Sequence, residues 1–265
     1  MNIHPTAIIS EKAELHPTVK VGPYAVIEEG VKIGAGSTVG SHAMIFGPTI
    51  IGENNEICSF ALLGGAPQDI SYKGELTELI IGNGNLIREY VSIHRGTPHG
   101  AGKTVVGNNN MIMAYSHVGH DCVIGDYVIM VNAATLGGHV QVGDRATVGG
   151  LVGVHQFCRI GRFAFIGGGS GVGLDVPPFA MVTGVRGKMR ISGLNKVGMR
   201  RNGFTRETIS KIDNAFRILY RSSKLLHKDA IKKVEQEIVD CEYVDELVAF
   251  FRTSKRGVVK RIKSE

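Results

Sequence analysis

The chain has 265 residues, a formal net charge of +6, and 43% hydrophobic against 20% charged residues, which excludes an intrinsically disordered chain. Glycine, at 36 residues, is roughly twice as frequent as usual, and proline is scarce at 8. No Gly-X-Y period is present, so a collagen is excluded, and many tight corners between short aliphatic strands are favoured.

The charge is divided unevenly along the chain. Residues 1–185 carry 10 Lys/Arg against 14 Asp/Glu, whereas residues 186–265 carry 20 against 10. A basic final third favours an acidic partner, which could be nucleic acid, anionic lipid or an acidic protein. No aromatic platform or nucleic-acid motif accompanies it, so we do not expect a nucleic-acid partner.

The N-terminus lacks the basic start and apolar run of a signal peptide. The longest uncharged stretch, residues 127–143, contains Asn132, Thr135 and His139 and is a poor membrane span, so no stable membrane insertion is expected. The cysteines, none of which forms a C-x-x-C pair, are Cys58, Cys122, Cys158 and Cys241. Reduced thiols and a cytoplasmic location are therefore predicted.

From residue 3 to residue 176 an aliphatic residue recurs every six positions, often followed by glycine, as in Ile33-Gly34 and Val142-Gly143. Six-residue sides joined by corners make an 18-residue coil of three sides, whose successive turns stack about 4.8 Å apart. The period predicts a mainly β domain, a parallel β-helix of hexapeptide repeats with roughly ten coils, and the known form of this repeat is left-handed. The phase slips once, by one residue, between Ile93 and Val106.

Two segments, residues 64–78 and 96–104, lack the hexad pattern and are expected to be loops extruded from the prism. Loops on a rigid scaffold often carry binding groups, although a tolerated insertion is an equally good interpretation of each.

After Pro177-Pro178 the hexads stop, and from Thr205 onward the apolar period becomes helical. Three short helices are predicted, with Thr205 and Asp229 as N-caps, followed by a basic tail over residues 255–265. The expected domains are a β-helix over residues 1–185 and a small α-helical C-terminal domain over residues 186–265.

Six of the ten histidines fall between residues 94 and 155. With an 18-residue coil, His139 stacks on Asp121, Gly138 stacks on His120, and Gln156 stacks on Gly138. His155 likewise stacks on Gly137. One patch near a single corner is therefore predicted, comprising His117, His120, Asp121, Gly138, His139, His155 and Gln156.

Three interpretations of this patch compete. The imidazoles could cap corners structurally, three of them could bind zinc, or one could act as an acid–base catalyst. The third gains from detail, because Asp121 beside His120 can fix the imidazole tautomer and the bare amide of Gly138 can approach an oxyanion. Cys122 is expected to point inward and to be inert.

Seven motifs carry a family resemblance that spans nearly the whole chain. They are QDISYKGE at 68–75, SIHRGT at 92–97, SHVGHDC at 116–122, NAATLGGHV at 132–140, VHQFCRIG at 154–161, DVPPF at 175–179 and RRNGF at 200–204. At these residues the chain resembles the UDP-N-acetylglucosamine acyltransferases of lipid A biosynthesis, which depend on acyl carrier protein.

The resemblance implies a homotrimer with active sites between neighbouring prisms and no cofactor or metal. It implies transfer of an (R)-3-hydroxyacyl chain from acyl carrier protein to the 3-position of a UDP sugar. The implied catalytic residues are His120 as general base, Asp121 as its orienting acid and Gly138 as oxyanion donor. The implied substrate contacts are Asp69, His94, His117, His139, His155, Gln156 and Arg201, with Gly168 at the position that measures acyl length.

The resemblance also implies a role for the basic C-terminal region, because acyl carrier protein is acidic and would be attracted to it. The side chains expected to steer it are Arg186, Lys188, Arg190, Lys196, Arg200 and Arg206.

Two residues depart from the family pattern: Ser71, where lysine is frequent, and Val197, where glutamate is frequent. Both positions touch the nucleotide sugar in the family. A 3-amino analogue of UDP-N-acetylglucosamine is therefore an alternative acceptor, and a zinc-dependent lyase of the same fold is a less favoured alternative function.

Overall fold

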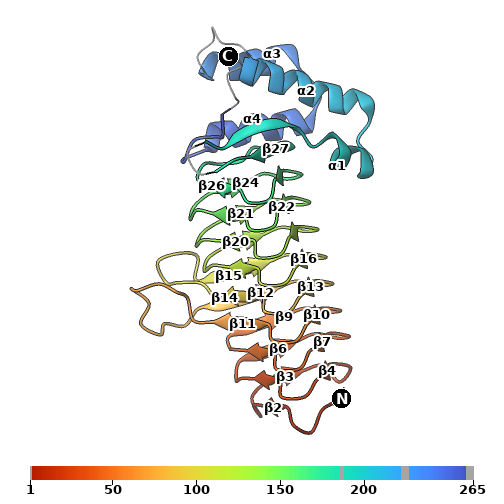
Figure 1. The fold of residues 1–265 in the computed structure, drawn as a ribbon, viewed down its shortest axis with the longest axis vertical. Coiled ribbons are helices and arrows are strands. Elements are labelled where there is room, and N and C mark those ends of the chain that lie inside the picture. The colour runs from red at the N-terminus through yellow and green to blue at the C-terminus, as the bar shows by residue number, and fades with distance from the viewer. Residues whose placement is uncertain (1, 186–187, 222–226, 261–265) are drawn as a thin grey trace.

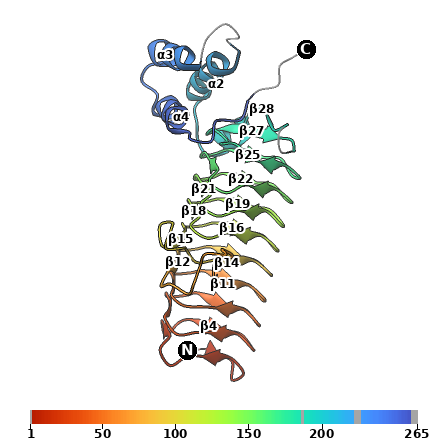
Figure 2. The ribbon, with the colours of Figure 1, turned by 90° about the vertical axis from the view of Figure 1, so that its left-hand side faces the viewer.

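The computed structural model describes residues 2–185, 188–221 and 227–260. Short strands wind into a three-sided prism along the long axis of the molecule, and a helical region covers its C-terminal end (Figures 1 and 2). Each side of the prism is one sheet, here named A, B and C, and the strands are parallel except for the last strand of sheet A.

Sheet A consists of β1 (Asn2–Ile3), β4 (Lys20–Val21), β7 (Thr38–Val39), β10 (Glu56–Ile57), β13 (Leu86–Ile87), β16 (Met111–Ile112), β19 (Ile129–Met130), β22 (Thr147–Val148), β25 (Phe165–Ile166), β27 (Ala180–Thr183) and β28 (Arg190–Leu194). Sheet B consists of β2 (Ile8–Ile9), β5 (Val26–Ile27), β8 (Met44–Ile45), β11 (Leu62–Gly65), β14 (Ser92–His94), β17 (His117–Val118), β20 (Thr135–Leu136), β23 (Gly153–Val154) and β26 (Gly171–Val172). Sheet C consists of β3 (Glu14–Leu15), β6 (Val31–Ile33), β9 (Thr49–Ile51), β12 (Glu78–Ile81), β15 (Lys103–Val106), β18 (Val123–Ile124), β21 (Gln141–Val142) and β24 (Arg159–Ile160).

The hexad residues fill the inside of the prism, as predicted. Ile45, Leu63 and Ile93, for example, are fully buried and lie on consecutive strands of sheet B. Many corners turn through a residue with positive φ, such as Asp121 at +59° and His139 at +61°. The inward side chains of successive coils, such as Val19 and Val21 on one side, therefore build a continuous aliphatic core.

The pairing register explains the slip in the repeat. Most partners lie 18 positions apart, but Ile57 pairs with Ile87, 30 positions on, and Ile87 pairs with Ile112, 25 positions on. The first insertion, between β11 and β12, equals two hexads and preserves the phase. The second, between β14 and β15, exceeds one hexad by one residue and shifts it. Both predicted loops are thus confirmed, and both leave the corner between sheets B and C.

The sheet continues past the last hexad. β27 lies beyond Pro177-Pro178, within the expected β-helix domain of residues 1–185, and pairs in parallel with β25. β28 then turns back antiparallel to β27. The expected boundary at residue 185 stays a prediction, because residues 186–187 lie outside the described ranges.

The helical region contains α1 (Lys196–Arg201), α2 (Arg206–Arg221), α3 (His227–Glu237) and α4 (Glu242–Thr253). The three expected helices correspond to α2, α3 and α4, whereas α1 was not expected. Thr205 caps α2 as predicted, since its Oγ1 accepts a hydrogen bond from the amide of Thr208 (3.1 Å). Asp229 lies within the first turn of α3, so its prediction as an N-cap is wrong.

Arg159 joins the prism to this region. Its guanidinium bonds the buried carboxylate of Asp175 (3.2 Å) and also donates to the carbonyl oxygen of Phe250 near the end of α4 (2.8 Å). Among helices of the described ranges, none has the length and apolar character of a membrane span.

Candidate active site

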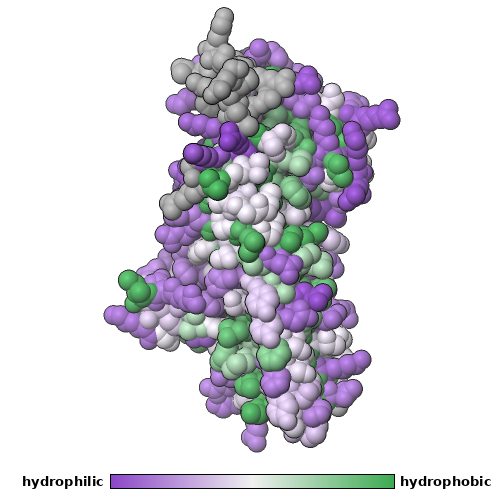
Figure 3. Space-filling view, viewed as in Figure 1, coloured by the Kyte–Doolittle hydropathy of each residue, from purple (hydrophilic) through white to green (hydrophobic). Residues whose placement is uncertain are grey.

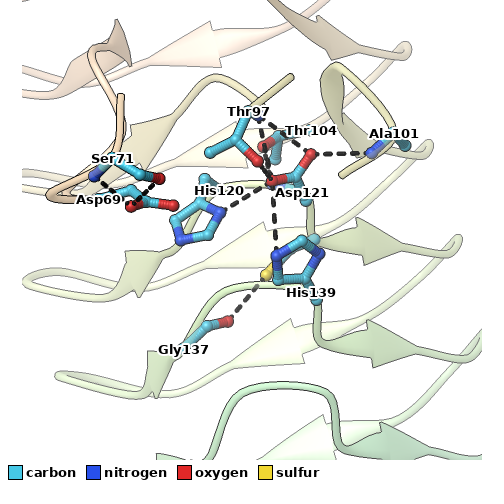
Figure 4. Close-up of polar contacts among 10 residues, drawn as sticks. Asp69, Ser71, Thr97, Ala101, Thr104, His120, Asp121, Gly137 and His139 are labelled. Atoms are coloured by element: carbon cyan, nitrogen blue, oxygen red, sulfur yellow. Dashed lines mark hydrogen bonds and ion pairs between the residues drawn. The ribbon is translucent and has the colours of Figure 1, made fainter. Parts of the chain in front are cut away.

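His120 and Asp121 form a hydrogen-bonded pair at the B–C corner, between β17 and β18. His120 Nδ1 lies 2.8 Å from Asp121 Oδ2 (Figure 4). The Asp121 amide donates to Thr104 Oγ1 (2.8 Å), which fixes the backbone of the turn. Because Nδ1 is engaged, the other ring nitrogen of His120, Nε2, is left to face a ligand.

The Asp121 carboxylate is almost entirely buried, with its side chain 1% exposed. Burial alone would raise its pKa, but hydrogen bonds from Thr97 and His120 outweigh burial and lower it. The carboxylate is therefore held ionised, as an acceptor for His120.

The next coil brings Gly138 and His139 against this pair, as the 18-residue stacking predicts. A Cβ on Gly138 would lie 2.5 Å from Cε1 of His120, so a side chain there would displace the imidazole. Within the described residues, the Gly138 amide donates to no other group. The Gly138 backbone thus lies directly beside the imidazole, and its N–H is not used by the described part of the fold.

His139 packs between the pair and Phe157. Its ring stacks on Phe157 with centroids 4.4 Å apart, and its Nε2 lies 3.8 Å from Asp121 Oδ2. Burial lowers the pKa of His139 despite the nearby Asp121 carboxylate. Asp121 therefore has one strong imidazole partner, His120, rather than two.

His94 ends β14, and His117 lies on β17, the neighbouring strand of sheet B that leads into the His120 corner; their rings make a T-shaped contact with centroids 4.8 Å apart. His117 Nδ1 is hydrogen-bonded to Ser92 Oγ (2.8 Å). His94 is 6% exposed and its Nδ1 lacks a hydrogen-bond partner among the described residues. Burial lowers the pKa of His117, and burial with neighbouring His117 and His120 lowers that of His94 to about 4.

Asp69 lies in the loop between β11 and β12. Its Oδ1 accepts hydrogen bonds from the amide (2.8 Å) and the hydroxyl (2.7 Å) of Ser71, and these bonds lower the pKa of Asp69. In Figure 4 its carboxylate faces the His120 ring. The loop thus places an ionised carboxylate in front of His120.

Not all the predicted contacts lie at this corner. His155 and exposed Gln156 follow β23, one coil beyond Gly138, as expected. Gly168 lies instead at the A–B corner, between β25 and β26, with a Cβ position 3.2 Å from the Gly150 carbonyl oxygen.

Arg201 lies at a third place, the end of α1. The neighbouring Asn202 is bonded to Arg145 at the C–A corner (2.6 Å). Figure 1 shows α1 on the side of the molecule opposite to the projecting loops. Within one chain, Arg201 is therefore not part of the His120 site.

A metal could reach three of these side chains, because ligand atoms of His120, Asp121 and His139 all lie within 4.8 Å of one another. Both oxygens of Asp121, however, already accept hydrogen bonds from protein donors, Thr97 and Ala101. A carboxylate with its lone pairs so occupied suits hydrogen bonding to an imidazole better than metal ligation.

Sequence reasoning missed the residues that surround Asp121: Thr97, Gly100, Ala101 and Thr104. The signals for this segment were the loss of the hexad pattern over residues 96–104 and the one-residue phase slip between Ile93 and Val106, but neither pointed to contacts with Asp121.

Comparison with known proteins identifies the family. Residues 175–259 match a family described as "Udp N-acetylglucosamine O-acyltransferase; Domain 2", and residues 12–47 and 103–138 match bacterial transferase hexapeptide repeats. An acyl-[acyl-carrier-protein]–UDP-N-acetylglucosamine O-acyltransferase of Thermodesulfovibrio yellowstonii is 53% identical over 97% of this chain and 99% of its own. The chain belongs to the UDP-N-acetylglucosamine O-acyltransferase family.

Solved structures of UDP-N-acetylglucosamine acyltransferases agree with this assignment. That of Francisella novicida has a TM-score of 0.93 with 42% identity, covering 97% of this chain and 94% of that one. The structure from Campylobacter jejuni has a TM-score of 0.92 with 37% identity, and the match covers 98% of this chain and 100% of that one. The predicted fold class, a left-handed parallel β-helix followed by helices, is thereby confirmed, as is the predicted family.

Proposed function

We propose that this protein transfers an (R)-3-hydroxyacyl chain from acyl carrier protein to the 3-position of UDP-N-acetylglucosamine, the first step of lipid A biosynthesis. Relatives named for this activity support the assignment. The observation that carries the mechanism is the bond between His120 Nδ1 and Asp121, which leaves Nε2 free next to the backbone of Gly138.

The reaction uses these groups in sequence. His120 Nε2 removes the proton from the sugar 3-hydroxyl as its oxygen attacks the thioester carbonyl carbon. The Gly138 amide donates to the oxygen that becomes negative, and Asp121 stabilises the imidazolium that forms. The carbon–sulfur bond then breaks, and the thiolate of the carrier takes the proton from His120.

A homotrimer, with each site shared between two subunits, accounts for the scattered contacts. Arg201 lies on the far side of the prism from His120, so it can reach such a site only from a second copy. The loop between β11 and β12 projects with Ile70 and Leu76 almost fully exposed, and Figure 3 shows apolar atoms at its tip. Exposed apolar side chains of this size are typical of a surface that a partner covers.

The carrier would approach the basic C-terminal region. Residues 186–265 hold twice as many basic as acidic side chains. Of the expected steering residues, Lys188, Arg190, Arg200 and Arg206 are available there, Lys196 is paired with Asp213 (3.3 Å), and Arg186 lies outside the described residues. Such steering weakens at high salt. The reduced thiols and the acyl carrier both suit a cytoplasmic enzyme.

The test is product mass spectrometry with a panel of acyl carriers, offering both UDP-N-acetylglucosamine and its 3-amino analogue. We expect ester formation that His120→Ala lowers by about 100-fold or more in kcat, with little change in KM. Undiminished turnover by this variant would refute the general-base role. Preferential amide formation would assign the 3-amino acceptor, for which Ser71 and Val197 are the motivating departures.

A further inference from the structure

The insertion between β14 and β15 encloses the carboxylate of Asp121. The Thr97 amide donates to both carboxylate oxygens (3.1 Å each), and the Ala101 amide donates to Oδ1 (3.1 Å). The Thr97 hydroxyl donates to Oδ2 at 2.6 Å, and Oδ2 is also the oxygen bonded to His120. All these donors, apart from His120, come from the insertion that breaks the hexad phase.

The backbone of the insertion passes too close to Asp121 for any side chain at residue 100. A Cβ on Gly100 would lie 2.3 Å from both Cγ and Oδ1 of the carboxylate. Thr97 is 1% exposed and Asp121 5%, so protein groups rather than bulk water solvate the carboxylate. The orientation of this carboxylate is therefore set by the insertion.

We propose that Thr97 is a positioning residue for the reaction, which rests on the function proposed above. Its hydroxyl and amide hold Oδ2 where it accepts the Nδ1–H of His120, and this fixes the tautomer with Nε2 free. By sharing Oδ2, the hydroxyl also limits how strongly the carboxylate stabilises the imidazolium. The insertion therefore positions the His120–Asp121 pair and is not merely a tolerated loop.

Other titratable groups around His120 and Asp121 could also affect the pH dependence of the reaction. Asp121 is faced by His120 and His139, and His120 is faced by Asp69 as well as by His94 and His117. A variant at Thr97 changes none of these charges. A shift in the pH dependence of the variant therefore reports on the hydroxyl.

The kinetic test compares Thr97→Val, which removes the hydroxyl and keeps the shape, with Thr97→Ser, which keeps it. We expect Thr97→Val to lower kcat by about 10- to 100-fold with KM for the UDP sugar changed less than about 3-fold, and Thr97→Ser to restore most of the rate. The acidic limb of the kcat/KM profile should move to higher pH in Thr97→Val, because Oδ2 then stabilises the imidazolium more.

Two further variants separate positioning from folding. Gly100→Ala should lower kcat similarly, because its Cβ displaces the carboxylate. Ser37→Ala removes another buried hydroxyl, one that donates to the Gly52 carbonyl oxygen (2.9 Å) several coils away, and should leave kcat unchanged. An equal loss in Ser37→Ala, or wild-type rates and pH profile in Thr97→Val, would overturn the proposal.

A readout without substrate keeps this inference distinct from the proposed function. In ¹⁵N-histidine-labelled protein, the His120 ring signals, assigned with His120→Gln, should report an Nδ1-protonated tautomer. They should shift in Thr97→Val but not in Ser37→Ala. Failure of the wild type to transfer acyl groups would refute the function alone, whereas unshifted ring signals would refute the role of Thr97.

Discussion

At the scale of single residues, the stacked coils place side chains with contrasting environments within one corner. The Cys122 side chain, adjacent to Asp121, points into the prism and is fully buried, with its Sγ 3.1 Å from the Gly137 carbonyl oxygen. Burial raises the pKa of this thiol to about 12. The thiol next to the His120–Asp121 pair is therefore unsuited to act as a nucleophile.

We predict that Cys122→Ala retains kcat within about 3-fold of the wild type, because no covalent intermediate forms on the thiol. In the folded wild type, iodoacetamide at pH 8 should leave Cys122 unmodified, as peptide mass spectrometry can determine. Cys58, which is half-buried, serves as the more accessible thiol in the same sample. Loss of turnover together with labelling of Cys122 would contradict this.

His94 makes a second prediction at this scale. Its pKa is lowered to about 4, so the folded protein binds this proton less readily than the unfolded chain does between pH 6.5 and 4. Stability contributed by the neutral ring is therefore present above about pH 6.5 and is lost as the pH falls. The loss approaches about 3 kcal/mol by pH 4.

The measurement is the free energy of unfolding by urea at several pH values. We expect the wild type to lose stability more steeply toward pH 4 than His94→Gln, which has no ring to protonate. His4→Gln, at an exposed histidine near the N-terminus, is the control and should keep the wild-type slope. If the free energy of unfolding depended on pH identically in all three proteins, His94 would not be the source of the lost stability.

At the scale of elements, stacking converts single residues into ladders. Inside the prism, Asn85 donates to Asn55 Oδ1 (2.9 Å) and to the Gly107 carbonyl oxygen (3.0 Å), and accepts from the Asn110 amide (2.9 Å). These bonds satisfy backbone groups at the C–A corner of successive coils, immediately before β10, β13 and β16. Replacing one asparagine of this buried ladder would leave the polar groups that it bonds without hydrogen-bond partners.

We therefore predict that Asn85→Ala lowers the free energy of unfolding by about 2–4 kcal/mol. Activity per folded molecule should persist at low temperature, since Asn85 lies away from the B–C corner. Thermal and urea unfolding provide the measurement. Asn2→Ala, at an exposed residue, should be nearly neutral, and a comparable loss there would show that the ladder is not the cause.

An outer ladder shows the limit of sequence reasoning for elements. Tyr24, His42, Phe60, Tyr90 and Tyr115 stack along the A–B corner with ring centroids 4.9–5.1 Å apart. The first three follow the 18-residue period, but the next two are offset by the insertions. The constant spacing follows from the coil repeat, and it becomes visible only after the register is known.

At the scale of the whole molecule, one chain holds two incomplete halves of the proposed site. His120, Asp121 and Gly138 lie at the B–C corner, whereas Arg201 lies near the C–A corner. Closed cyclic assembly would bring unlike corners of two copies together.

This arrangement predicts complementation between inactive variants. When His120→Ala and Arg201→Ala chains are co-expressed and purified through two tags, some sites in mixed trimers receive His120 from one subunit and Arg201 from another. With random mixing, about a quarter of the sites are complete, and activity should exceed that of either variant alone. Activity no higher than the mean of the two separate variants would show that each site lies within one chain.

Much of the candidate site could be predicted from the sequence alone. The 18-residue repeat fixes which residues are neighbours in successive coils, so the contacts of His120 with Gly138 and of Asp121 with His139 followed from counting. The end of the prism could not be counted in this way. β27 lacks a hexad signature, because its pairing with β25 depends on the chain returning after Pro177-Pro178.

The sequence by itself determined the β-helix, its aliphatic core and the histidine cluster, because a period repeated over many coils specifies register and burial together. The tertiary structure alone decided what surrounds the Asp121 carboxylate and where Arg201 lies. Insertions and capping helices carry no such period. Their paths are set by contacts distant in sequence, such as Thr97 with Asp121 and Arg145 with Asn202.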